Sequence, residues 1–429
     1  MKINVLVFPC GSQAAIEINN CLKESLRFEI FGASSVDDHG KHIYKNYIGD
    51  LPNISAHNFI QKLNEAINND NIKYIIPTHD SVALYLMENR LHIGATIVAS
   101  DLETAKVCRY KSMLYERFKK YDFNPITYNN IYDILTFPIF LKPDNGQGGN
   151  GTHIAYNKDE LQYIITKFPN LLLCEYLPGQ ELTIDCFTDR KGNLRLVSPR
   201  TRERTLSGIS VKSRLLEPSQ EITNIAVQIN KELSFRGYWF FQLKEDHSGK
   251  FKLMEVSTRF ASSASLTFSK DINLPLLTLL DFEDLDIDIL PNNYDVEMDR
   301  SFINRYHLGI DYERVYVDLD DTLILRNEYC NEQLLAFLYQ CLRKKREMVL
   351  ITKHISNVTD TLNKFKIHPG LFTDVIHIKP EEHKHLFISE DKKSIFIDNS
   401  FAERKKVKEI IGIPTFDLSN VECLLDWRG

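Results

Sequence analysis

Hydrophobic and polar positions along the first hundred residues repeat with the periods of short strands and of helices. Residues 3–8 form an apolar run, residues 9–13 have the composition of a turn, and residues 14–24 carry apolar side chains at helical spacing. Further β-rich runs, separated by polar or helical segments, follow at residues 28–32, 72–76 and 96–98. Strands that alternate with helices indicate a parallel sheet with crossover helices.

The middle of the chain is expected to contain one helix and several longer strands. The helix is predicted over residues 101–119, capped by Ser100 or Asp101, and an apolar strand then ends in Lys142. The other strands are expected at both ends of 170–187, at 195–204, and in a hairpin of 239–245 with 251–259. Alternation directs four polar residues of this hairpin to one face or edge of the sheet: Gln242, Glu255, Ser257 and Arg259.

From about residue 299 the alternation of strands and helices starts again. An amphipathic helix is expected over residues 331–345. Four strands are expected, which end at or near residues 318, 352, 378 and 398. Residues of catalytic type stand at the ends of the first, second and fourth strands, where a parallel sheet presents its site. We therefore predict a second α/β domain in this part of the chain.

Length and composition narrow the class of protein. A chain of 429 residues is too long for one ordinary core, and 43% hydrophobic with 26% charged residues is typical of a soluble globular protein. The net charge of −6 argues against a nucleic-acid partner. The eight cysteines form no CxxC pair, no stretch has membrane-spanning length, and the first strand lacks a cleavage site. We therefore expect a cytoplasmic protein with reduced thiols and no membrane partner.

A glycine-rich segment follows the strand that ends in Lys142. Four glycines occur within six residues, at positions 146, 148, 149 and 151. Such a segment lets backbone N–H groups approach a phosphate closely, and the lysine supplies a compact positive charge. The order of residues excludes a P-loop and a GxGxxG dinucleotide turn. The glycines alone would also fit a flexible hairpin tip, but the motifs further along the chain favour a phosphate site.

Polar residues also follow two strands of the first predicted sheet. Ligands of parallel sheets lie beyond the carboxyl ends of the strands, so two groups of residues are expected to face one crevice: Gly11, Ser12 and Gln13, and Thr78, His79 and Asp80. Ser12 and Asp80 could instead be N-caps of the helices that follow. Both interpretations stay open at this point.

The motifs of residues 1–295, taken in order, resemble the ATP-grasp superfamily, in particular its carboxylate–amine ligases and carbamoyl-phosphate-synthase-like members. The resemblance lies in Lys111, Lys142 with its glycine segment, the sequence EYLPGQE at 175–181, Gln242, and Glu255-x-Ser257-x-Arg259. It implies a Rossmann-like pre-ATP-grasp domain at residues 1–99 and an α+β ATP-grasp domain at residues 100–297.

The same resemblance implies a role for each matched residue. Lys111 and Lys142 would hold the ATP phosphates, and Gly146, Gly148 and Gly149 would close over them. The adenine pocket would be lined by Glu175, Tyr176 and Leu177, and the ribose would be held by Glu181. The metal ions would be faced by Gln242, Glu255 and Ser257, with Glu255 bridging two of them. Relatives usually carry Asn at the position of Ser257, so this departure puts the metal stoichiometry in doubt.

Arg259 is the predicted catalytic cation of this half. With one of Arg200, Arg202, Arg204 or Lys212, it would neutralise the transferred phosphoryl group or bind a carboxylate. Each of these residues could also be an ordinary surface charge.

Residues 311–429 resemble the haloacid dehalogenase (HAD) superfamily, through Asp318-x-Asp320-x-Thr322, Thr352, a following lysine and Asp398. The resemblance implies a capless HAD-like Rossmannoid domain at residues 298–429. Asp318 would be the nucleophile and Asp320 the general acid and base, which favours a phosphatase over a dehalogenase. Thr352 would bind the phosphoryl oxygens.

The metal and the lysine of this domain follow from the same resemblance. Asp318, Asp398 and the backbone carbonyl of Asp320 would hold magnesium. Either Lys379 or Lys384 is the catalytic lysine. Relatives often carry a second acid beside the position of Asp398; Asn399 stands there in this chain, and Glu403 could substitute.

These resemblances lead us to predict a bifunctional enzyme. An ADP-forming ligase would join a small-molecule carboxylate to an amine through an acyl phosphate, using ATP and Mg²⁺, with Mn²⁺ as an alternative. An HAD phosphohydrolase would act through an aspartyl phosphate on a phosphorylated small molecule of the same pathway. Assembly into a homodimer is a further interpretation that the sequence leaves open. The alternatives are a carbamoyl-phosphate-type or kinase-like enzyme that releases a phosphorylated product, and a nucleotide-binding module with an inactive HAD domain.

Overall fold

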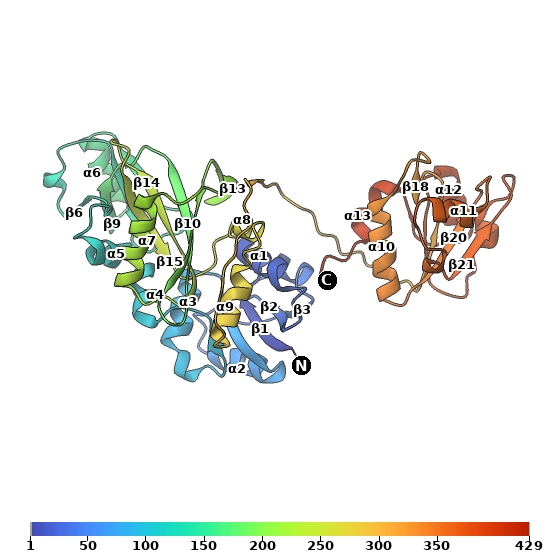
Figure 1. Ribbon diagram of the computed structural model, residues 1–429, viewed down its shortest axis with the longest axis horizontal. Helices are drawn as coiled ribbons and strands as arrows, with labels where there is room; N and C mark the ends of the chain where they lie inside the picture. The colour runs from blue at the N-terminus through green and yellow to red at the C-terminus, as the bar shows by residue number, and fades with distance from the viewer. Residues whose placement is uncertain (1, 429) are drawn as a thin grey trace. The chain divides into compact units, whose positions relative to one another are not determined.

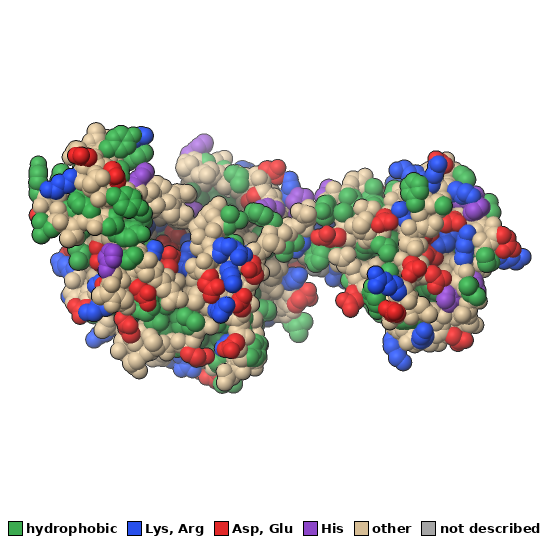
Figure 2. Space-filling model, turned by 90° about the horizontal axis from the view of Figure 1, so that it is seen from above, with side chains coloured by type: hydrophobic (Ala, Val, Ile, Leu, Met, Phe, Trp, Pro, Cys, Tyr) green, Lys and Arg blue, Asp and Glu red, His purple; other side chains and the backbone are tan. Residues whose placement is uncertain are grey.

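A computed structural model describes residues 2–428, so residues 1 and 429, the outer ends of the predicted domains, lie outside the described part. The chain divides into two compact units, of which the first ends at Phe302 and the second covers Ile303–Arg428 (Figure 1). Acidic and basic side chains intermingle over the face shown in Figure 2. Among the described residues, no helix is both long and apolar enough to cross a membrane.

The first unit begins with a five-stranded parallel sheet of order β3-β2-β1-β4-β5. Its strands are β1 (Ile3–Phe8), β2 (Phe28–Ala33), β3 (Asn46–Ile48), β4 (Ile72–Pro77) and β5 (Thr96–Ile97). The crossover helices are α1 (Gln13–Leu22), α2 (Phe59–Asn69) and α3 (Asp80–Glu88). Strands β1 and β4 are neighbours, so the segments that follow them meet at one edge of the sheet. The pattern had not indicated β3, which is short and half-buried.

The predicted helix over residues 101–119 is two helices, α4 (Leu102–Arg109) and α5 (Lys111–Phe118). Tyr110 has extended backbone angles and interrupts the helix, and Asp101, not Ser100, caps α4 by accepting from the N–H of Thr104. The N–H of Lys111 donates instead to the carbonyl oxygen of Asp144, at 3.1 Å. The break therefore lets a long-range contact with the segment after β7 replace a helical hydrogen bond.

The rest of the first unit is built on antiparallel sheets. A four-stranded sheet of order β6-β9-β7-β8 comprises β6 (Thr127–Tyr128), β7 (Ile139–Pro143), β8 (His153–Ala155) and β9 (Leu171–Glu175), with helix α6 (Lys158–Lys167). The larger sheet, of order β11-β10-β14-β15, comprises β10 (Glu181–Thr188), β11 (Leu194–Thr201), β14 (Gly237–Glu245) and β15 (Phe251–Ser257). A third sheet comprises β12 (Arg204–Leu206), β13 (Ile209–Arg214) and β16 (Glu297–Asp299).

Alternation along β14 separates the two faces of the larger sheet. Trp239, Phe241 and Leu243 pack with α5 and α7 (Gln220–Glu232) in one core, and these helices cover that face (Figure 1). Tyr238 and Phe240 point to the other face. That second face also borders the cleft described below.

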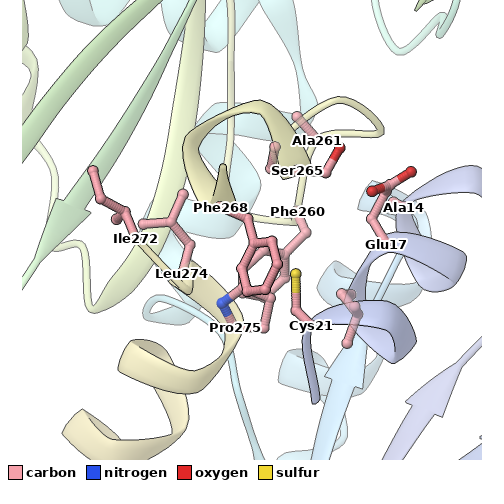
Figure 3. A pocket seen from close by; sticks show the side chains of 12 residues that line it. Ala14, Glu17, Cys21, Phe260, Ala261, Ser265, Phe268, Ile272, Leu274 and Pro275 are labelled. Atoms are coloured by element: carbon pink, nitrogen blue, oxygen red, sulfur yellow. The ribbon is translucent and has the colours of Figure 1, made fainter. Parts of the chain in front are cut away.

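The second face is joined to the parallel sheet through α8 (Ser265–Phe268) and α9 (Leu274–Phe282). Figure 3 shows a small apolar crevice here, where Phe260 and Phe268 lie close to Cys21 of α1. This shared core explains why the parallel sheet and the antiparallel sheets form one compact unit.

The second unit contains a five-stranded parallel sheet of order β21-β20-β17-β22-β23. Its strands are β17 (Arg314–Val317), β20 (Glu347–Thr352), β21 (Asp374–His377), β22 (Ser394–Ile397) and β23 (Thr415–Phe416). Its helices are α10 (Glu332–Arg343), α11 (Val358–Lys364), α12 (Phe401–Ile410) and α13 (Val421–Leu424). A short hairpin of β18 (Ile324–Leu325) and β19 (Tyr329–Cys330) follows β17. Both units therefore have a mixed α/β fold, as predicted.

Candidate functional site

A cleft in the first unit gathers side chains from all of its sheets. It is bordered by the segments after β1 and β4, by the glycine segment, by the β12–β13 turn and by β14 and β15. Nine of the predicted site residues line it: Lys111, Lys142, Gly146, Gly148, Gly149, Glu181, Gln242, Glu255 and Arg259. The structure thus brings together residues that are up to 148 positions apart in the sequence.

Two lysines supply positive charge to this cleft. Lys142 of β7 is buried, donates a hydrogen bond to the hydroxyl of Tyr115 and lies 4.9 Å from the centre of that ring. Lys111 opens α5 and donates to the carbonyl oxygen of Gly146 at 2.9 Å. Burial lowers the pKa of both ammonium groups, although the nearby carboxylate of Glu255 opposes this effect. An anionic ligand that reached both lysines would relieve the cost of their burial.

The glycine segment lies against the turn between β12 and β13. Gly148 and Gly208 have positive φ angles of 60° and 78°. A Cβ atom on Gly208 would lie 2.5 Å from the Cα atom of Gly148. Only glycine permits this backbone-to-backbone approach, so the two segments together form the roof of the cleft.

Acidic and amide groups lie on the opposite side of the cleft, on the larger sheet. Gln242 and Glu255 are paired across β14 and β15. The amide nitrogen of Gln242 donates to Oε1 of Glu255 at 3.2 Å. Its amide oxygen accepts from Nη1 of Arg202 at 3.3 Å. Glu181 lies 2.5 Å from Nε of Arg202. A carboxylate and an amide oxygen are ligands that suit Mg²⁺ when phosphates supply the others.

Asp80 is not among the residues that line the cleft, but it contacts Arg259, which is one of them. Its carboxylate accepts from Oγ of Ser257 at 2.6 Å and from Nε of Arg259 at 2.8 Å. The Ser257 hydroxyl is therefore directed at Asp80, and Ser257 is not among the residues that line the cleft. Ser12 caps α1, because its side chain accepts from the N–H of Ala15. Asp80 does not cap α3: it is the first residue of that helix, and its side chain makes no capping hydrogen bond.

The remaining predicted residues of this half lie at the edge of the cleft or outside it. Arg200 and Arg202 line the cleft, whereas Arg204 pairs with Asp299 and Lys212 with Glu203. Arg200 is fully buried in an ion pair with Asp185. The three residues predicted for adenine lie at the end of β9 and directly after it, and are not among the lining residues: Glu175, Tyr176 and Leu177. The Glu175 carboxylate accepts from the N–H of Ile126 at 2.8 Å.

The second unit places two carboxylates at the carboxyl ends of neighbouring strands. Asp318 follows β17 and Asp398 follows β22, and both are buried. The ammonium group of Lys384 lies 2.5 Å from Oδ1 of Asp318 and 2.6 Å from Oδ2 of Asp398. The hydroxyl of Thr322 donates to the second oxygen of Asp318 at 2.9 Å.

These buried charges do not balance. Burial raises the pKa of Asp318 to about 6, with Lys384 opposing and Asp398 adding to the rise. Two carboxylates share one ammonium group, so the pair keeps a negative charge that a divalent cation would offset. The two carboxylates are oxygen ligands of the kind that Mg²⁺ prefers, and they are the only acidic side chains that the ammonium group of Lys384 contacts among the described residues. Within residues 2–428, no group of three or more His, Cys, Asp or Glu side chains has a metal-binding arrangement.

The structure distinguishes the two candidate lysines. Lys384 is buried against both carboxylates, whereas Lys379 is exposed and its N–H donates to the carboxylate of Glu382. Thr352 ends β20 and is fully buried. Its position places the hydroxyl at the same sheet edge as Asp318, because β20 and β17 are neighbours.

Asp320 has a partner that the sequence analysis missed. Nδ1 of His354 lies 2.8 Å from Oδ1 and 3.0 Å from Oδ2 of Asp320, and its Nε2 lies 2.7 Å from the hydroxyl of Thr361. His354 follows Thr352 by two residues at the carboxyl end of a strand. That position was a signal that could have identified it.

Glu403, which could have replaced the missing second acid, has a structural role in the geometry observed. Its carboxylate lies 2.8 Å from Nζ of Lys353 and accepts from the N–H of Lys384 at 3.0 Å. Burial alone would raise the pKa of Glu403, but Lys353, the N–H of Lys384 and His383 lower it from 4.5 to about 2. Glu403 thus fixes the backbone of the lysine that reaches Asp318.

This pKa gives a prediction for stability. We expect Glu403→Gln to destabilise the second unit at pH 7 by about 2 kcal/mol, because a depressed pKa stabilises the folded state above the unfolded value. The difference from wild type should shrink as the pH falls from 4.5 towards 2, where the wild-type carboxylate becomes protonated. Urea unfolding across this pH range measures the difference. Glu409→Gln, at an exposed position of the same helix, is the control; an equal loss in both variants would contradict the assignment.

The comparisons with known proteins concern the fold and the family. Residues 167–301 match a family model described as ATP-grasp in the biosynthetic pathway with Ter operon. A search of curated proteins gave no match. The family match lies within the first unit, so the HAD resemblance of the second unit stays a prediction.

Several solved structures share the fold. A biotin carboxylase–β-γ-ATP complex from Campylobacter jejuni is 14% identical, with a TM-score of 0.56 over 67% of this chain and 72% of that chain. N5-carboxyaminoimidazole synthetase from Staphylococcus aureus, complexed with ADP, is 14% identical, with a TM-score of 0.55 over 68% and 80%. An L-amino acid ligase from Bacillus licheniformis is 16% identical, with a TM-score of 0.51 over 65% and 73%. Together with the family match, this likeness supports a relationship of this chain to the ATP-grasp superfamily.

Proposed function

We propose that the first unit is an ADP-forming carboxylate–amine ligase. The observation that carries this proposal is the convergence of Lys111, Lys142, the glycine segment, Glu255 and Arg259 on one cleft. A cleft with cations under a glycine roof suits a polyphosphate, and solved structures with this fold include an ADP complex and an amino acid ligase.

The proposed reaction has two steps. A carboxylate oxygen of the acid attacks the γ-phosphorus of ATP, which gives an acyl phosphate and ADP; the amine then attacks the acyl carbon and expels phosphate. Lys111 and Lys142 would hold the phosphates, and Arg259 would orient the acid. The glycine roof would exclude water from the acyl phosphate. Magnesium held by Glu255 and Gln242 would offset the charge that develops on the phosphates.

Phosphorus NMR with Mg-ATP and a mixed pool of carboxylates and amines tests this proposal. We expect ADP and phosphate to accumulate only when an acid and an amine are both present. ADP formation with an acid alone, together with a new acyl-phosphate signal, would point to the kinase-like alternative. Absence of turnover with every pool, despite tight binding of Mg-ATP, would overturn the ligase proposal in favour of a binding module.

We also propose that the second unit is a phosphohydrolase of the HAD type. The observation that carries this proposal is Asp318, which lies buried between Lys384 and Thr322 and beside Asp398. Asp318 would attack the phosphorus of a phosphate ester, and Asp320, held by His354, would protonate the leaving oxygen. Water would then attack the phosphorus of the aspartyl phosphate, with Asp320 taking its proton, which releases phosphate and restores Asp318. Lys384 and Thr352 would stabilise the phosphoryl oxygens. Magnesium at Asp318 and Asp398 would reduce repulsion between the two anions.

The partners of both units would be small molecules, and the ligase and phosphatase would act in one pathway because they share one chain. Each of the eight cysteines is a free thiol. Free thiols are consistent with the cytoplasmic location that we propose.

A further inference from the structure

Asp80 lies where three separate parts of the first unit meet. It opens α3 directly after β4, at the carboxyl edge of the parallel sheet. Ser257 and Arg259, from the end of β15, donate to its carboxylate at 2.6 and 2.8 Å. Nε2 of Gln147, from the glycine segment, donates to Oδ2 of the same carboxylate at 2.7 Å.

The charges in this cluster indicate that Asp80 is ionised. Burial would raise the pKa of Asp80, but the charge of Arg259 and the hydrogen bonds from Ser257 and Arg259 lower it below its usual value. Its side chain is 16% exposed, so these hydrogen bonds are sheltered from water. An ionised, sheltered acceptor makes stronger hydrogen bonds than a neutral or exposed one.

The three donors differ in how firmly their own segments are held. Ser257 is the last residue of β15 and is buried, and Arg259 makes a second hydrogen bond to the carbonyl oxygen of Phe260. Gln147 instead belongs to a loop whose neighbours Gly148 and Gly149 are exposed. The bond between Gln147 and Asp80 therefore ties the exposed loop to two well-packed parts of the fold.

We propose that Asp80 is a positioning residue that orients Arg259 and, through Gln147, holds the glycine segment closed over the cleft. This inference rests on the proposed ligase function as far as it concerns ATP. It also assigns a role to Ser257: in place of a metal contact, its hydroxyl supports Asp80. Closure of the glycine segment over the cleft thus depends on the parallel sheet, whose segments after β1 and β4 also border the cleft.

Two substitutions at position 147 test this link. Gln147→Glu keeps the side-chain shape but places a second carboxylate against Asp80, so the loop should open. Gln147→Met keeps the approximate length of the side chain and removes the donor without adding a charge, so the loop should open less than in Gln147→Glu. Gln162→Glu, the same change on the exposed face of α6, is the control.

Two measurements are made on the full chain. The first is hydrogen exchange of the amides of residues 146–151 without nucleotide, and the second is the Kd for Mg-ATP by calorimetry. We expect Gln147→Glu to speed exchange and weaken binding by about tenfold each, the order of magnitude of one lost charge-assisted hydrogen bond. Gln147→Met should speed exchange and weaken binding by about threefold each, and the control should match wild type.

Two results would overturn the proposal: unchanged loop exchange in Gln147→Glu, or loop exchange in Gln147→Met equal to that of wild type. A wild-type protein that does not bind Mg-ATP would refute the proposed function. In that case the exchange measurement without nucleotide still decides whether Asp80 holds the loop.

Discussion

Replacement of Asp318 by Asn is expected to reduce phosphate-ester hydrolysis at least about a thousandfold, because an amide cannot act as the nucleophile. The side chain keeps its size and can still accept from Thr322. It loses the charge that attracts Lys384, which is buried. Hydrolysis of p-nitrophenyl phosphate with Mg²⁺ measures the effect without knowledge of the natural substrate.

Asp321→Asn provides a matched control for this variant. Asp321 is exposed, and its positive φ angle of 52° is one that Asn also tolerates. Its carboxylate accepts from the N–H of Arg326, a contact that an amide oxygen can also make. We expect near-normal hydrolysis in this control. Equal rates in Asp318→Asn and wild type would refute the proposed phosphatase site, and loss of activity in both variants would show that the assay reports folding of the β18–β19 region.

Replacement of Lys142 by Met is expected to abolish ATP turnover by the first unit. Methionine fills the space of the lysine stem, and removal of a buried charge does not by itself weaken the fold. The phosphates would lose one charge-assisted contact, which corresponds to a Kd for Mg-ATP that is higher by about 10-fold to 100-fold. Turnover should fall further, because the lysine also stabilises charge in the transition state.

Calorimetry and release of ADP measure these two effects separately. Lys158→Met, at an exposed position that opens α6, is the control, because it removes the same charge from the same part of the first unit. A Kd and a turnover rate equal to those of wild type in Lys142→Met would place the phosphates elsewhere. The Asp318→Asn and Lys142→Met variants should each leave the activity of the other unit intact if the two sites act independently.

Features that depend on neighbours in the sequence could be predicted from the pattern alone. The strands before Lys142, Asp318, Thr352 and Asp398 were recognised from their apolar runs, because a buried strand has a continuous local signature. The end positions of the strands before Asp318, Thr352 and Asp398 also predicted that polar residues would meet, since parallel strands present their carboxyl ends at one edge. The structure places Asp318 and Asp398 on neighbouring strands in this way. It also places Lys142 and the glycine segment in one cleft with Glu255 and Arg259.

Contacts between segments that are distant in the sequence could not be predicted from the pattern. The choice of Lys384 over Lys379 depends on which side chain the loop before β22 turns inward, and both lysines have the same local context. Tyr110 breaks a periodic helix because Lys111 bonds to Asp144. The hydrogen bond from the hydroxyl of Ser257 to Asp80, 177 residues away, had no signal in the sequence.

Hydrophobic periodicity therefore determined the type of the longer buried elements and, in the parallel sheets, the edge at which polar residues would collect. Tertiary structure alone decided which side chains meet at that edge. The physical reason is that a hydrogen bond or ion pair requires two atoms within about 3 Å, and that separation is set by the packing of whole elements and not by the residues next to either atom.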